Sequence, residues 1–164
     1  MSDIQKFHKA EAEFCKQFKA TFVTDLSLQY KDIDAVTVKG NTVSVKDQTW
    51  SSGKYGGITV EMELVNPQTG QSIPGNFPTS EAKFYAWRVT FNQEVYWMCF
   101  KKEVLEAFIE ERKHTLPTFQ LMAKTQEHNC AEGRVYTQAR GFKINLSLLH
   151  GLDGVKFIKS IKDF

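Results

Sequence analysis

Near the start of the chain, apolar residues recur at steps of three and four positions. The stripe consists of Ile4, Phe7, Phe14 and Phe18. This spacing is typical of one face of an amphipathic helix, and it predicts a helix that runs to about Thr21. Glu11 falls within the same stripe. A carboxylate on a buried face is costly unless it is paired or binds a cation, which makes Glu11 a candidate functional residue.

The next patterned region alternates with a period of two. Residues 33–39 and 42–48 are rich in β-branched side chains and flank Gly40-Asn41, which predicts a β-hairpin. Residues 58–64 alternate in the same way and predict a third strand. The Ser- and Gly-rich stretch 49–57 is predicted to be a loop.

The second half of the chain carries weaker patterns. Strands are predicted at 84–91, 94–100 and 141–146, a short helical turn near 79–82, and a helix at 101–113. The rest of 114–164 has no firm pattern. The element order predicts an α/β or α+β protein, with a mixed central sheet flanked by helices.

Composition adds limits to this outline. The chain has 164 residues, of which 41% are hydrophobic and 24% charged, which is typical of one globular domain. No apolar run approaches the roughly 20 residues that cross a bilayer, and the charged N-terminal region lacks the apolar segment of a signal peptide. We therefore expect a soluble, cytoplasmic protein without a membrane partner. The net charge of +2 argues against a broad basic surface.

The cysteines predict neither a disulfide framework nor a complete metal site. Cys15, Cys99 and Cys130 are widely separated and odd in number. His128 and Cys130 resemble the beginning of a zinc site, but no CxxC or HxxxH partner accompanies them.

Polar side chains in the predicted strands suggest a shared site. Ser44 and Lys46 fall on one face of the second strand because side chains alternate. If the third strand is a neighbour, Asp34, Lys46 and Glu61 converge on one patch. Carboxylates beside a lysine suit a divalent cation, since Mg²⁺ commonly takes one or two carboxylates plus waters. The lysine would orient the attacking water or stabilise charge on a phosphate.

Each of these residues also has a purely structural interpretation, in which it serves a turn, a strand edge or a solvated surface. In that interpretation Asp34 caps a turn, Lys46 is an edge-strand charge, Glu61 and Glu63 form a solvated face, and Glu11 pairs with Lys9 or Lys16.

Taken in order, several stretches resemble the PD-(D/E)XK nuclease superfamily, and in particular small nuclease-like proteins of phages and bacteria. The similarity covers about residues 4–113. It runs through the leading helix, Asp34, Ser44-Val45-Lys46-Asp47, Ser51-Ser52-Gly53-Lys54, Ile58-Thr59-Val60-Glu61, Pro74-Gly75, Thr79-Ser80-Glu81-Ala82-Lys83-Phe84-Tyr85 and Lys101-Lys102-Glu103-Val104-Leu105. The motif acid of the family falls on Ser44, which cannot ligate a metal as a carboxylate does. Glu61 and Glu11 are the candidates to replace it.

The resemblance implies a restriction-endonuclease-like αβββαβ core, with 114–164 as a C-terminal extension of a single domain. It implies a DNA endonuclease or exonuclease that uses Mg²⁺ or Mn²⁺ and works as a homodimer. In this hypothesis Asp34 and Glu61 hold the metal, Lys46 positions the water and Glu11 supports the metal; Gln48, Lys54 and Ser44 contact the substrate. The alternative is an inactive nuclease-like scaffold that binds nucleic acid or a host protein, which Ser44 favours.

Aromatic residues divide into two groups. Trp87, Tyr96 and Trp97 are predicted to be core or sheet-surface residues. Trp50 and Tyr55 flank Lys54 beside the proposed site, where a base and a phosphate would be contacted. The row of Lys156, Lys159 and Lys162 is either a solvated face or a DNA contact.

Overall fold

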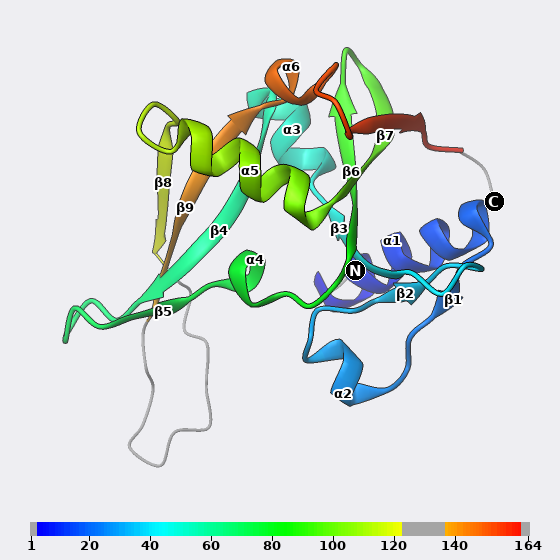
Figure 1. The fold of residues 1–164 in the computed structure, drawn as a ribbon, viewed down its shortest axis with the longest axis horizontal. Coiled ribbons are helices and arrows are strands. Elements are labelled where there is room, and N and C mark those ends of the chain that lie inside the picture. Colours follow the sequence, from blue (N-terminus) through cyan, green and yellow to red (C-terminus); the bar gives the residue numbers. More distant parts are fainter. Residues whose placement is uncertain (1–2, 123–136, 162–164) are drawn as a thin grey trace.

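The protein has an α+β fold with two β-sheets flanked by helices (Figure 1). The computed structural model describes residues 3–122 and 137–161, with the burial of side chains given from Lys9 onward. Among the described helices, none is long and apolar enough to cross a membrane.

The first sheet holds the hairpin predicted from the sequence. Its strand order is β1-β2-β3-β6-β7-β10. The strands are β1 (Thr21–Phe22), β2 (Ala35–Val36), β3 (Thr42–Asp47), β6 (Phe84–Phe91), β7 (Glu94–Lys101) and β10 (Lys156–Lys159). β1, β2 and β3 form an antiparallel meander, and β3 then pairs with β6 in parallel. The β2–β3 and β6–β7 hairpins are therefore confirmed, although β2 is shorter than predicted.

The second sheet has the strand order β5-β4-β9-β8. Its strands are β4 (Gly57–Val65), β5 (Ser72–Pro74), β8 (Thr118–Met122) and β9 (Gln138–Asn145). β9 pairs with β4 from Gly57 to Val65. The C-terminal part of the chain thus supplies strands to both sheets, since β10 pairs with β7.

Six helices accompany the sheets in the described residues. They are α1 (Asp3–Phe18), α2 (Leu26–Gln29), α3 (Thr49–Tyr55), α4 (Asn76–Thr79), α5 (Lys102–Arg112) and α6 (Leu146–Leu149). Figure 1 shows α1 beside β2 on one flank, and α5 lying across the strands of the second sheet on the other.

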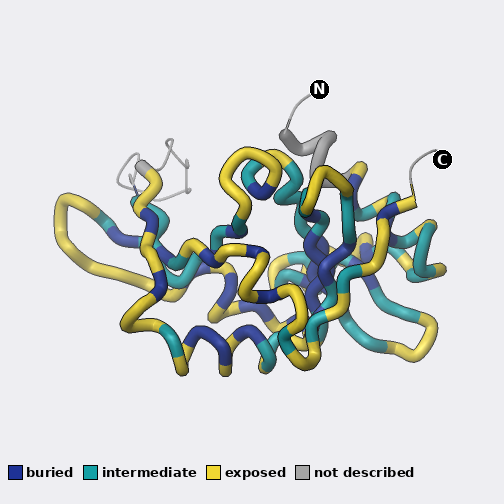
Figure 2. The backbone as a smooth tube through the Cα atoms, turned by 90° about the horizontal axis from the view of Figure 1, so that it is seen from above, coloured by how far each residue is buried: buried dark blue, intermediate teal, exposed yellow. Residues whose placement is uncertain are grey.

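Two hydrophobic clusters lie on opposite faces of the first sheet. Side chains of α1, including Phe14, pack against Val43 and Val45 of β3 and Trp97 of β7. The larger cluster joins the other face of β6 and β7 to β4, β9 and α5. Figure 2 shows buried stretches along the strands and α5, with exposed connections around them. Ser44 alternates with Val43 and Val45, so it faces the second sheet rather than α1.

The strand predicted at 58–64 is confirmed as β4, but it is not a neighbour of β3 and belongs to the second sheet, so the condition for convergence of Glu61 with Asp34 and Lys46 is not met. Two predictions about local structure were wrong. The stretch predicted as a loop contains α3. The short helix α4 precedes the predicted turn at 79–82. The side chains of Ile4 and Phe7 lie outside the described residues, so the first part of the helical stripe is not tested.

Candidate active site

Asp32 is the residue that the sequence analysis missed, and its position is set by the end of α2. The Asp32 amide donates to Gln29 O at 3.0 Å, and the Ile33 amide donates to Leu28 O at 3.1 Å. This pair of hydrogen bonds forms a Schellman motif, which places Asp32 at the left-handed position with a φ of 63°. Ile33 and Leu28 pack together, as this motif favours. An aspartate here, where glycine is usual, suggests that its carboxylate serves a purpose.

The Asp32 carboxylate joins two side chains of β3. Ser44 Oγ donates to Asp32 Oδ2 at 2.8 Å, and Lys46 Nζ donates to Asp32 Oδ1 at 3.1 Å. Ser44 is fully buried, whereas the side chains of Lys46 and Asp32 are 29% and 21% exposed. The carboxylate therefore lies between Ser44 and Lys46 and remains accessible to solvent.

Asp34 immediately precedes β2 and continues the hydrogen bonding to β3 beyond the start of that strand. The Asp34 amide donates to Val43 O at 2.9 Å, and Val45 N donates to Asp34 Oδ2 at 2.8 Å. The carboxylate thus replaces a strand partner for the Val45 amide. Burial is the largest cause that raises the pKa of Asp34, and the Val45 amide opposes it.

Glu11 reaches the same cluster from α1. Its carboxyl group hydrogen-bonds to that of Asp34, and burial together with the charge of Asp34 raises its pKa to about 7. Lys46 lowers the pKa of Glu11 and Asp32 raises it, so Glu11 lies within electrostatic reach of both. Two carboxyl groups in such contact require a shared proton or a cation.

Tyr85 and Cys15 are two uncharged titratable residues beside the carboxylate cluster. Tyr85 is the β6 partner of Ser44 and is 1% exposed, and burial raises the pKa of its hydroxyl. Cys15 lies one turn after Glu11, and burial followed by the charges of Glu11 and Asp34 raises the pKa of its thiol. Both groups therefore stay protonated at neutral pH, so neither adds a charge to the cluster.

Glu61 does not belong to this cluster. It lies on β4 in the second sheet, where its side chain accepts a hydrogen bond from Asn76 N at 3.1 Å. The predicted convergence of Glu61 with Asp34 and Lys46 was based on β4 as a neighbour of β3, and β3 instead lies between β2 and β6. The predicted role of Glu61 as metal ligand therefore has no geometric support.

The structure places Gln48 and Lys54, the other two predicted substrate contacts, in different surroundings. Gln48 Nε2 donates to Thr59 O at 3.1 Å and Thr59 N donates to Gln48 Oε1 at 3.0 Å, so this amide ties β3 to β4. Lys54 lies on α3 and contacts the rings of Trp50 and Tyr55. Ser44 holds Asp32 and is too deeply buried to present its hydroxyl to a substrate.

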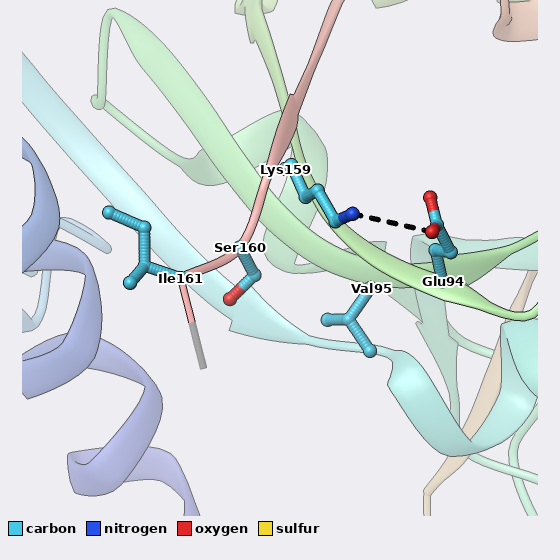
Figure 3. Close-up of a pocket in the computed structure, with 5 residues that line it drawn as sticks. All are labelled: Glu94, Val95, Lys159, Ser160 and Ile161. Carbon is cyan, nitrogen blue, oxygen red and sulfur yellow. Dashed lines mark hydrogen bonds and ion pairs between the residues drawn. The ribbon is translucent and has the colours of Figure 1, made fainter. Parts of the chain in front are cut away.

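A pocket lies elsewhere on the first sheet, and none of its lining residues belongs to the carboxylate cluster. It has a volume of about 420 Å³ and is lined by residues of β7 and the end of β10. Figure 3 shows that Lys159 and Glu94 pair with each other there, at 3.3 Å. Lys156 and Lys159 are exposed, while Lys162, His128 and Cys130 lie outside the described residues.

A divalent metal ion at this cluster would take its protein ligands from the carboxyl groups. Within residues 3–122 and 137–161, no group of three or more His, Cys, Asp and Glu side chains is arranged to hold a metal ion. Glu11 and Asp34 nevertheless offer two adjoining carboxyl groups. This suits Mg²⁺, which uses one or two carboxylates and fills its other positions with water and phosphate oxygens.

Comparison with known proteins adds no assignment. No family model and no curated protein matches the chain. The function is therefore inferred from the cluster formed by Glu11, Asp32, Asp34 and Lys46.

Proposed function

We propose that the protein is a metal-dependent nuclease of the PD-(D/E)XK type, in which Asp32 supplies the carboxylate missing from Ser44. The observation that carries this proposal is the contact of Asp32 with both Ser44 and Lys46, at 2.8 and 3.1 Å. A metal and a substrate respond to the position of a carboxylate and not to its place in the chain. Asp32 therefore meets the need that Glu61 and Glu11 were expected to meet.

The order of the elements supports this proposal. The chain runs from α1 into the antiparallel meander β1-β2-β3, then through α3 and, after the strands β4 and β5, into β6 parallel to β3. With the short helix α2 left out, and with β4, β5 and α4 treated as an insertion, the order is α-β-β-β-α-β. This is the order that the resemblance to the nuclease superfamily implies.

Asp34 and Glu11 are the residues that would hold Mg²⁺ or Mn²⁺, and the charge of Asp32 acts on both of them. The metal would neutralise charge on a phosphodiester and lower the pKa of a bound water. The protein's own side chains do the rest. Asp32 holds the Lys46 ammonium at 3.1 Å, which aims a cationic donor at the same cluster. A fixed donor of this kind stabilises negative charge that develops on a phosphate oxygen.

The second candidate is a scaffold that binds nucleic acid or a host protein without cleaving it. It is favoured by the engagement of both Asp32 oxygens with Ser44 and Lys46, together with the lack of a three-ligand metal group among the described residues.

Under the leading proposal, DNA is the partner, the protein acts in the cytoplasm of a bacterial or infected host cell, and a homodimer would cut two strands.

The test is cleavage of labelled linear, branched and single-stranded DNA with Mg²⁺ or Mn²⁺. We expect Asp34→Ala and Lys46→Ala to abolish cleavage, and the matched control Glu61→Ala to retain it because Glu61 lies in the other sheet. Loss of cleavage in Glu61→Ala alone would contradict the site. A folded wild-type protein that cleaves no substrate and takes up no Mn²⁺ would favour the binding scaffold.

A further inference from the structure

The helix α3 presents its large side chains to solvent and its small ones to the sheet. Ser52 is its only buried residue, and its hydroxyl accepts a hydrogen bond from Thr90 N at 2.7 Å. Gly53 lies against Thr90, where an added Cβ would be 3.4 Å from the Thr90 Cβ. Trp50 and Tyr55 are 69% and 68% exposed. This is the reverse of the usual arrangement, in which a helix buries its aromatic residues.

The exposed side chains of α3 form one ordered group. The rings of Trp50 and Tyr55 are 5.9 Å apart with an interplanar angle of 80°. Lys54 Nζ lies 5.0 Å from the Trp50 ring and 5.2 Å from the Tyr55 ring. Cation–π contacts hold the lysine beside both rings, so a cation and two aromatic surfaces occur together before any ligand arrives.

We propose that Trp50, Lys54 and Tyr55 bind the unpaired nucleotides of a single DNA strand. Base-stacking platforms in single-strand-binding proteins combine exposed aromatic rings with nearby positive charge in this way. In a duplex the bases are already stacked on one another and are not available to these rings. The other residues of α3 are Thr49, Ser51, Ser52 and Gly53, so this helix offers a protein partner no further large apolar side chain.

The aromatic group lies close to the carboxylate cluster along the chain. Trp50 follows Lys46 by four residues, so their Cα atoms are at most about 14 Å apart. A strand that stacks on α3 therefore passes within a few nucleotides of Lys46. The assignment of DNA as the ligand rests on the proposed function, and it narrows the substrate to DNA with an unpaired segment next to the scissile bond.

Intrinsic tryptophan fluorescence gives a direct readout of this site. The chain has three tryptophans, and Trp87 and Trp97 are only 2% and 0% exposed. Quenching by an unlabelled deoxythymidine oligomer, added with EDTA so that no cleavage occurs, therefore reports on Trp50. We expect saturable quenching by the single strand and none by a duplex. No quenching by the single strand, or equal quenching by the duplex, would overturn the proposal.

Binding measured by anisotropy of a labelled oligomer tests the individual residues. Trp50→Ala should weaken binding at least about fivefold, and Trp50→Phe should recover most of the loss because stacking is kept. Tyr30→Ala is the matched control, since Tyr30 is an 88% exposed aromatic residue at the C-terminal end of α2 rather than on α3. Equal losses in Trp50→Ala and Tyr30→Ala would refute a specific site, and tighter binding of single-stranded RNA would refute the assignment to DNA.

The outcomes separate this inference from the proposed function. Trp50-dependent binding without cleavage in Mg²⁺ or Mn²⁺ would support the stacking site and overturn the nuclease. Cleavage whose KM for single-stranded substrates is unchanged in Trp50→Ala would support the nuclease and overturn the stacking site.

Discussion

Ser44 and Asp32 are linked by a hydrogen bond of 2.8 Å across twelve positions of the chain. Under the proposed function, the serine stands at the position of the nuclease motif acid, and the aspartate brings an acid next to it from the end of α2. The serine hydroxyl fixes one carboxylate oxygen, and Lys46 contacts the other. The pair thus fixes the Asp32 carboxylate beside both Ser44 and Lys46.

The first prediction concerns the charge of Asp32. Asp32→Asn keeps a residue type that tolerates a positive φ and can still hydrogen-bond to Ser44, but it removes the charge beside Lys46. We expect metal-dependent cleavage to fall by about a hundredfold or more, as for the loss of one preorganised electrostatic group. Initial rates under saturating metal would measure this loss. Asp153→Asn, on an exposed loop, is the control, and full activity in Asp32→Asn would show that Asp32 is outside the site.

The sequence predicted part of this site for identifiable reasons. Lys46 and Asp34 stand at the ends of short alternating segments, and the alternation itself placed Ser44 and Lys46 on one face. Glu11 was detected because a carboxylate interrupted an apolar stripe. These signals are local, and the structure brings all three residues into one cluster.

Asp32 was missed because its position depends on backbone geometry rather than on periodicity. The available signal was the pair Leu28 and Ile33, whose spacing matches the apolar contact of a Schellman motif around Asp32. Glu61 was misassigned because alternation defines the faces of a strand but not its neighbours. Sheet order depends on long-range pairing, here the pairing of β4 with β9 across a large part of the chain.

The helix α3 was read as a loop for a related reason. Its Ser and Gly residues have turn propensity, yet Ser52 Oγ donates to Gln48 O at 2.6 Å and Gly56 ends the helix with a φ of 75°. Packing of these small residues on β6 overrides the local preference. The Ser and Gly residues of 49–57 therefore reflect the close packing of α3 against β6 of the first sheet.

The second prediction follows from the shared environment of Glu11 and Asp34. The pKa of Glu11 rises from 4.5 to about 7 in the folded protein. Because the folded-state pKa is the higher one, the group stabilises the fold below about pH 4.5, and this contribution is lost as the pH rises through about 7. A fully buried group with this shift would contribute about 3 kcal/mol, and solvent screening of half-buried Glu11 reduces the expectation to roughly 1 kcal/mol.

Urea denaturation of the wild type and Glu11→Gln at about pH 5 and about pH 8 measures this contribution. We expect the free energy of unfolding of the wild type to fall more than that of Glu11→Gln across the interval. Excess Mn²⁺ at the higher pH should restore stability to the wild type, because a cation replaces the shared proton. Parallel pH dependence in the two proteins would show that Glu11 does not share a proton with Asp34.

The third prediction separates a structural role of Gln48 from substrate contact. The Gln48 amide satisfies both the N–H and the C=O of Thr59, at 3.0 and 3.1 Å, and joins the two sheets. Gln48→Ala should lower the free energy of unfolding by about 1–3 kcal/mol, since it leaves these backbone groups unpaired. Gln71→Ala, in an exposed loop, should change stability by less than about 0.5 kcal/mol. A normal stability of Gln48→Ala with a raised KM would instead restore the predicted substrate contact.

The fourth prediction tests the turn that joins β6 and β7. Phe91 pairs with Glu94, so Asn92 and Gln93 form a two-residue turn, and their φ angles of 49° and 68° are those of a type I′ turn. Glycine adopts this conformation without the steric cost that Gln93 carries. Gln93→Gly should therefore raise the free energy of unfolding by roughly 0.5–1 kcal/mol, measured by urea denaturation. Gln71→Gly, where φ is not positive, should lower it, and a lower stability of Gln93→Gly would show that the turn does not carry this strain.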